Sequence, residues 1–150
     1  MLLSKVLRIT GHAYIFFPFE KHSLLTTALT EAKLQFKNKP LIWHVKGEDT
    51  YMTFMWVSRA LSSPPRYVNE HQSHRRDVTA FHTLAKPYSL LYNLIDNSTT
   101  KGSFIVDPSA YDLSAVRVCL ETGRNVLANC PSKIVYEQCM KQIAETGGKR

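Results

Sequence analysis

The sequence predicts an α+β domain in which a small sheet, built on an N-terminal β-α-β-β unit, is followed by a C-terminal helical hairpin. Three observations support this fold class. Residues 41–46 and 51–57 are rich in branched and aromatic side chains and flank a short polar loop, which is the pattern of a β-hairpin. A helical periodicity precedes this hairpin, and two consecutive helical patterns lie near the C-terminus. The length of 150 residues suits a single domain spanning 1–150.

The first half of the chain supplies the β-α-β-β unit. Residues 12–17 (HAYIFF) predict a strand, which Pro18 closes because proline cannot donate to a ladder. Residues 19–38 carry apolar side chains at steps of three and four, and they predict an amphipathic helix of about five turns. The hairpin of residues 41–57 follows and contains both tryptophans of the chain.

The middle of the chain predicts a helix and a second hairpin. Asp77 is placed to cap a helix that ends at Lys86-Pro87. Residues 88–95 (YSLLYNLI) fit a strand or a helix, and we favour a strand because Pro87 precedes them and a turn-rich segment follows. Together with a short strand at 103–106 they would form the second hairpin.

The last third of the chain predicts the helical hairpin. Asp107-Pro108-Ser109 offers capping and first-turn residues, and an apolar stripe extends from Leu113 to Leu127. Pro131 suits the first turn of a second helix that includes Ile143. Two helices joined by a tight corner form a helical hairpin.

The basic composition favours anionic partners. The formal charge is +7, and the sequence pI is about 9.4. Residues 1–10 alternate basic and apolar side chains and contain no acid, which is typical of an organelle-targeting segment, so we expect a mitochondrial matrix location, with the cytoplasm as the alternative. No apolar run reaches the roughly 20 residues that a membrane-spanning helix needs.

The segment 58–76 is the predicted contact surface. It contains two adjacent prolines and carries a formal +3, and long irregular segments in compact domains often serve a partner. The tail 146–150 is also basic. The candidate residues for binding RNA or another anion are Arg59, Arg66, Tyr67, His74, Arg75, Arg76, Lys149 and Arg150.

The common catalytic, cofactor and metal motifs are not found in the sequence. Its six glycines form neither a dinucleotide-binding fingerprint nor a P-loop, so we expect no cofactor. Three cysteines without a CxxC pair indicate reduced thiols rather than a disulfide framework or a zinc ribbon. His71 and His74 lack nearby further ligands for a metal, and Glu48-Asp49 suits the hairpin loop better than acid–base catalysis.

The order of elements resembles the β-α-β-β-α-β sandwich, which many RNA-binding proteins use. Tyr14 and Phe16 share one strand face, and Phe54 and Trp56 share another, as bases would require in an RNA-recognition motif. The Lys46-Gly47 pair is not followed by the aromatics of that motif. We therefore expect the four rings to be core residues.

These observations predict a non-enzymatic structural subunit of a large mitochondrial ribonucleoprotein assembly. A mitochondrial ribosomal protein, which contacts rRNA and neighbouring protein subunits through the basic segment, fits them best. One alternative is an accessory subunit of a mitochondrial respiratory or ATP-synthase complex. Another is a small ligand-binding domain or enzyme with a pocket over the sheet near His44 and His82.

Overall fold

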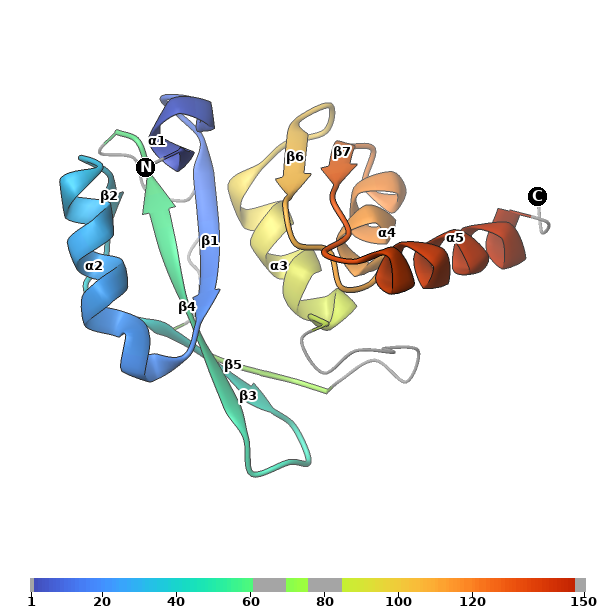
Figure 1. Cartoon of the computed structure of the whole chain (residues 1–150), viewed down its shortest axis with the longest axis horizontal. Coiled ribbons are helices and arrows are strands. Elements are labelled where there is room, and N and C mark those ends of the chain that lie inside the picture. The colour runs from blue at the N-terminus through green and yellow to red at the C-terminus, as the bar shows by residue number, and fades with distance from the viewer. Residues whose placement is uncertain (1, 61–69, 76–84, 148–150) are drawn as a thin grey trace. The chain divides into compact units, whose positions relative to one another are not determined.

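The computed structural model describes residues 2–60, 70–75 and 85–147 and divides the chain into two compact units, Met1–Arg75 and Arg76–Arg150. Each unit has a sheet of its own. Unit 1 begins with a short helix, α1 (Leu3–Val6), and contains most of the described strands; the described part of unit 2 contains three helices and two strands (Figure 1).

Unit 1 is a mixed sheet with the strand order β1-β4-β3-β5. The central strand is β4 (Tyr51–Ser58), which pairs along one edge with β1 (His12–Phe17) in antiparallel register. Its other edge pairs with β3 (Leu41–Val45) and then with the two-residue strand β2 (Gln35–Phe36). The predicted strand at 12–17 and the predicted hairpin are therefore confirmed.

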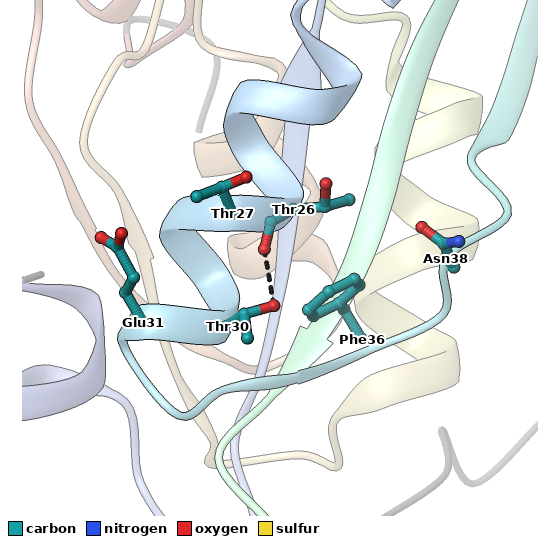
Figure 2. A pocket seen from close by; sticks show the side chains of 6 residues that line it. All are labelled: Thr26, Thr27, Thr30, Glu31, Phe36 and Asn38. Carbon is teal, nitrogen blue, oxygen red and sulfur yellow. Dashed lines mark hydrogen bonds between the residues drawn. The ribbon is translucent and has the colours of Figure 1, made fainter.

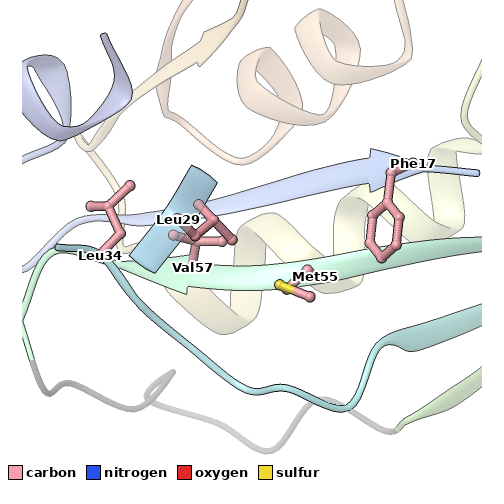
Figure 3. Packing of buried hydrophobic residues seen from close by; sticks show 5 residues of the cluster. All are labelled: Phe17, Leu29, Leu34, Met55 and Val57. Carbon is pink, nitrogen blue, oxygen red and sulfur yellow. The ribbon is translucent and has the colours of Figure 1, made fainter. Parts of the chain in front are cut away.

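The core of unit 1 lies between the sheet and the helix that follows β1. Leu29 and Leu34 pack against Phe17 of β1 and against Met55 and Val57 of β4 (Figure 3). Large aromatic side chains fill much of the remaining interior, since Trp43 and Phe54 are fully buried and the Phe16 ring stacks on that of Phe54. The expectation that these rings belong to the core is met by Phe54 and Trp56, whereas Tyr14 and Phe16 are half-buried.

The helix of unit 1 is shorter than predicted. A 3₁₀ turn at Phe19–Lys21 leads into α2 (His22–Glu31), and the chain leaves the helix through Lys33, whose φ of 55° is left-handed. The buried side chain of Leu34 and the pairing of β2 with β4 then hold residues 34–36 in extended structure. Tertiary packing thus overrides the helical periodicity that runs on to Phe36.

The predicted irregular segment 58–76 contains a strand. Residues His71–His74 form β5, which pairs in parallel with β3, and the indole Nε1 of Trp43 donates to the carbonyl oxygen of His74 at 3.2 Å. A hydrogen-bonding edge on β3 therefore orders a polar sequence that has no strand-like pattern of its own. Residues 61–69, including the two adjacent prolines, lie outside the described part of the chain.

Unit 2 is built on a parallel β-α-β unit. Strand β6 (Phe104–Asp107) pairs in parallel with β7 (Asn125–Ala128), and α4 (Ser114–Glu121) connects them. Helix α3 (Tyr88–Ser98) precedes β6 and packs against α4. Helix α5 (Lys133–Gly147) follows β7 (Figure 1).

Several predictions for unit 2 are wrong, although the strand at 103–106 and a helix after Pro131 are confirmed. Residues 88–95 belong to a helix, because Leu90 and Leu94, one turn apart, are both buried. The predicted second hairpin therefore does not form. The predicted helical hairpin is interrupted by β7, since α4 ends at Glu121. The helix predicted after Asp77 falls in residues 76–84, outside the described part.

Within the described residues, no helix has both the length and the apolar character required to cross a membrane.

Candidate functional site

The candidate site lies where β6 and β7 end side by side. Because the two strands are parallel, their carboxyl ends share one edge, and open α/β sheets usually bind ligands at this edge. We call the segments 107–113 and 129–130, which follow β6 and β7 there, the strand-end site. Its ladder continues past β7, since the Asn129 amide donates to the Asp107 carbonyl oxygen at 2.8 Å.

The two segments of the strand-end site are also joined to one another. The Ala110 amide donates to the Asn129 carbonyl oxygen at 2.9 Å, and Nδ2 of Asn129 donates to the Pro108 carbonyl oxygen at 3.1 Å. Asp112, nearly buried, accepts from the Ser114 amide at 2.9 Å and from its hydroxyl at 3.0 Å, at the start of α4. These bonds fix the backbone of the segment that connects β6 to α4.

Asp107 is the acidic group at the tip of β6. Its Oδ1 accepts a hydrogen bond from the Ser109 amide at 3.1 Å. Burial raises the pKa of this carboxyl, and the Ser109 bond and the charge of Lys86 oppose that rise. A partly desolvated carboxylate at a strand end is suited to a cationic ligand group, because the positive charge would stabilise the ionised carboxyl in place of the lost hydration.

Thiols surround the same edge. Burial, followed by the neighbouring Cys130 thiol, raises the pKa of Cys139 to about 12. Burial also raises the pKa of Cys119. Both of these cysteines are buried and outside any disulfide, so they behave as small apolar residues rather than as nucleophiles.

The amino-terminal edge of the same sheet is held by a buried arginine. Nη2 of Arg124 donates to Asp96 Oδ1 at 3.1 Å and to the Thr99 carbonyl oxygen at 2.8 Å, and its Nε donates to Thr99 Oγ1 at 2.8 Å. The guanidinium side chain is only 5% exposed. This arrangement ties β7 to the end of α3 and has a structural role.

Three of the eight candidate anion-binding residues lie in the described structure, and the prediction of an anion-binding surface is not tested by them alone. Arg59 Nη1 donates to the Leu7 carbonyl oxygen at 3.4 Å, His74 lies in β5 with its Nε2 3.1 Å from Gln72 Oε1, and Arg75 ends unit 1. The remaining candidates lie outside the described residues: Arg66, Tyr67, Arg76, Lys149 and Arg150.

The residues suggested for a ligand pocket, a metal site or acid–base catalysis do not meet at one site within the described structure. His44 is exposed on β3, and His82 lies outside the described part, so the suggested pocket between them is not tested. Within the described residues, no group of three or more His, Cys, Asp or Glu side chains could hold a metal ion. Glu48 and Asp49 lie in the exposed β3–β4 turn, as predicted.

The strand-end site was not predicted from the sequence, because Asp107 was assigned to a helix cap and Asn129 to a corner between helices. A usable pattern was present: a short apolar strand ends in an acid, and a helix and a second short apolar strand follow. That order predicts a parallel β-α-β unit, whose strand ends lie together.

Comparison with known proteins reveals similarity at the level of three-dimensional structure. No protein-family model and no curated protein sequence matches the chain. The solved complex of M1.HpyAVI with SAM matches with a TM-score of 0.76 at 15% identity, over 94% of this chain and 78% of that one. The cytosine-N4-specific PvuII DNA methyltransferase matches with a TM-score of 0.73 at 13% identity, over 91% of this chain and 65% of that one.

A third match is TTHA0409 from Thermus thermophilus, provisionally described as a DNA modification methylase and solved with S-adenosyl-L-methionine. Its TM-score is 0.71 at 13% identity, over 95% of this chain and 72% of that one. The chain shares its overall fold with these three solved proteins.

This likeness corrects the function predicted from the sequence. The prediction of a non-enzymatic mitochondrial ribosomal subunit that binds rRNA and neighbouring subunits is wrong, because the matching structures include a DNA methyltransferase and two proteins solved in complex with S-adenosylmethionine. The matches favour the alternative of an enzyme or ligand-binding protein. The ferredoxin-like arrangement is not supported either, since β6 pairs with β7 in a two-stranded sheet.

Proposed function

We propose that the chain acts in DNA methylation, as a methyltransferase that uses S-adenosylmethionine as the methyl donor and DNA as the acceptor. The observation that carries this proposal is the likeness to the M1.HpyAVI–SAM complex over 94% of the chain, which includes the β-α-β unit that bears the strand-end site. Because a fold alone does not fix a function, the proposal also depends on whether the residues of that site fit the donor.

The strand-end site fits the cationic part of the donor. S-adenosylmethionine carries a positively charged sulfonium, whose methyl group is the one transferred, and a positively charged amino group. The Asp107 carboxylate, at the carboxyl end of β6 where α/β sheets bind ligands, can attract such a cation. Its role would be to hold and orient the donor, and the hydrogen bond from Ser109 fixes the direction of the carboxylate.

No residue of the strand-end site is an evident binding group for the nucleoside part of the donor. Sites that bind nucleotides at strand ends use glycines so that the backbone can approach the ligand, and an acid about 20 residues further on to bind the ribose. Residues 108–113 include no glycine, and Asn129 and Cys130 follow β7 where the acid would be expected. The strand-end site therefore lacks both features by which strand ends commonly bind a nucleoside.

The charge distribution supports DNA as the acceptor. Unit 1 has ten Lys and Arg against five Asp and Glu, a formal +5, whereas unit 2 has nine against seven, a formal +2. Lys and Arg neutralise phosphates and release counterions, which is the main source of sequence-independent affinity for DNA. Unit 1 is thus the better candidate for the contact with DNA.

Equilibrium binding of both ligands tests the proposal. Isothermal titration of S-adenosylmethionine should give saturable binding to the whole chain, weakened at least tenfold by Asp107→Ala. The matched control is Asp49→Ala, which removes an acid from the exposed β3–β4 turn and should leave binding unchanged. Binding to duplex DNA should weaken steeply between about 50 and 200 mM salt. Donor binding that Asp107→Ala leaves intact, or absence of DNA binding at low salt, would contradict the proposal.

A further inference from the structure

Unit 1 contains a groove of about 460 Å³ beside α2. It is lined by Thr26, Thr27, Thr30 and Glu31 on the helix, and by Phe36 and Asn38 on the segment that follows (Figure 2). The ring of Phe36 lies between Thr30 and the side chain of Asn38, and its inner side packs against the core. The Phe36 ring therefore forms one wall of the groove and is held in place by the core. The other lining residues are polar, and the groove is open to solvent.

The polar groups from α2 present hydrogen-bond acceptors. The hydroxyls of Thr26 and Thr27 donate to the Ser23 carbonyl oxygen at 3.0 and 2.9 Å, and that of Thr30 donates to the Thr26 carbonyl oxygen at 2.8 Å. Since each hydroxyl hydrogen is used within the helix, its oxygen faces outward only with lone pairs. The exposed carboxylate of Glu31 adds two further acceptor oxygens.

The opposite wall supplies a mixed pair. The side chain of Asn38 offers one acceptor and an NH₂ donor, and its backbone carbonyl oxygen is already bonded to His22 Nε2 at 2.9 Å. An aromatic face with acceptors on one side and an amide on the other matches a planar base that carries an exocyclic amino group. Carboxylates accept from such amino groups, and Asn pairs with adenine in bidentate fashion.

Lysines border this groove without lining it. Lys33 lies two residues after the end of α2, and Lys37 lies between Phe36 and Asn38; both are exposed and form no ion pair with other described residues. Lys39, by contrast, pairs with Glu70 at 2.5 Å. Two such cations beside an aromatic groove suit a nucleotide, whose base would enter the groove while its phosphates remain in solvent.

We propose that the groove of α2 and β2 holds an unstacked DNA base, with the base on Phe36, its amino group on Glu31 and the threonine oxygens, and the adjoining phosphates on Lys33 and Lys37. This inference rests on the proposed action on DNA. Aromatic stacking sets the affinity, and the row of acceptors sets a preference for adenine, cytosine and guanine over thymine, which has no exocyclic amino group.

The test is fluorescence anisotropy with short single-stranded oligonucleotides of dA, dC and dT. The wild-type chain should bind oligo-dA and oligo-dC several-fold more tightly than oligo-dT. Phe36→Leu should weaken binding of all three about tenfold, since stacking on one aromatic ring is worth ~1–3 kcal/mol. Glu31→Gln, a surface change that does not disturb the fold, should reduce the preference over dT; Lys37→Gln should weaken all three equally.

The control variant is Glu145→Gln on the exposed surface of α5, which should change nothing. Equal binding of dA and dT by the wild type, or unchanged affinity and preference in Phe36→Leu and Glu31→Gln, would overturn the inference. An NMR titration with dAMP and dTMP, followed through the chemical shifts of the threonine methyl groups, measures binding in the groove independently of methylation. A chain that methylates DNA but shows no dAMP shifts at Thr26 and Thr30 would refute the groove and leave the proposed function standing.

Discussion

Asp107 carries the strand-end site and should reduce the stability of the fold. Its folded pKa is raised by burial, so the charged form is disfavoured in the native state relative to the unfolded chain. The resulting cost is present above the folded pKa and disappears as the pH falls below the unfolded value, near 3.8.

We therefore expect Asp107→Asn to be more stable than the wild type at pH 7, because the neutral amide can still accept the Ser109 hydrogen bond. The advantage should shrink as the pH is lowered toward 4. Urea unfolding at both pH values measures it. An equal difference at the two pH values would show that burial of the charge is not the cause.

The cysteines make a second prediction at this scale. Because the pKa of Cys139 is raised to about 12, it should remain almost entirely protonated at pH 8. Alkylation by iodoacetamide, followed by peptide mass spectrometry, should modify the half-buried Cys130 first and should reach Cys139 and Cys119 only in denaturant. Early modification of Cys139 in the native protein would contradict the burial of its side chain.

Individual residues show where the sequence was informative. Trp43 and Phe54 could be assigned to the core because large rings in a predicted hairpin have few alternatives to burial. Asp107 could not be separated from a helix cap, since an acid followed by Pro-Ser satisfies both interpretations. Only the parallel pairing with β7 distinguishes them.

At the scale of elements, Arg124 connects β7 to α3 and should be among the most sensitive positions of unit 2. Arg124→Ala removes its bonds to Asp96 and Thr99 and leaves a partly buried carboxylate and a carbonyl without the guanidinium. The loss should be about 3 kcal/mol in the free energy of unfolding, measured in urea.

The matched control is Lys133→Ala. Lys133 pairs with Glu137 at 3.7 Å on the surface of α5, where both side chains are more than half exposed. An exposed i,i+4 pair contributes well under about 1 kcal/mol. Equal losses in the two variants would mean that the Arg124 contacts do not hold the edge of the sheet.

Elements of unit 2 were mispredicted for a physical reason that centres on Gly123. The sequence places it within an apolar stripe from Leu113 to Leu127, but its φ is 67° and it ends α4. The Arg124 amide reaches back to the Cys119 carbonyl oxygen at 2.8 Å, which is the bond of a Schellman cap. Glycine in this position is a helix terminator, and the residues after it are free to form β7.

At the scale of the whole molecule, charge was the least reliable guide. A net charge of +7 predicts an anionic partner but does not distinguish rRNA from DNA, nor a structural subunit from an enzyme. The fold likeness is the basis for proposing an enzyme that acts on DNA, and it could not be found from the sequence because identities of 13–15% leave no recognisable motif. Because residues 108–113 contain no glycine, the sequence lacks the glycine-rich fingerprint that would have indicated a nucleotide-like cofactor.

Transfer of the methyl group is the most direct measurement of the proposed function. The whole chain is incubated with unmethylated DNA and S-adenosylmethionine that carries a tritiated methyl group, and the recovered DNA is hydrolysed to nucleosides and analysed. We expect label in a methylated nucleoside of the DNA, greatly reduced by Asp107→Ala and unaffected by Asp49→Ala. DNA that stays unlabelled after incubation with folded wild-type chain, donor and acceptor at low salt would contradict it.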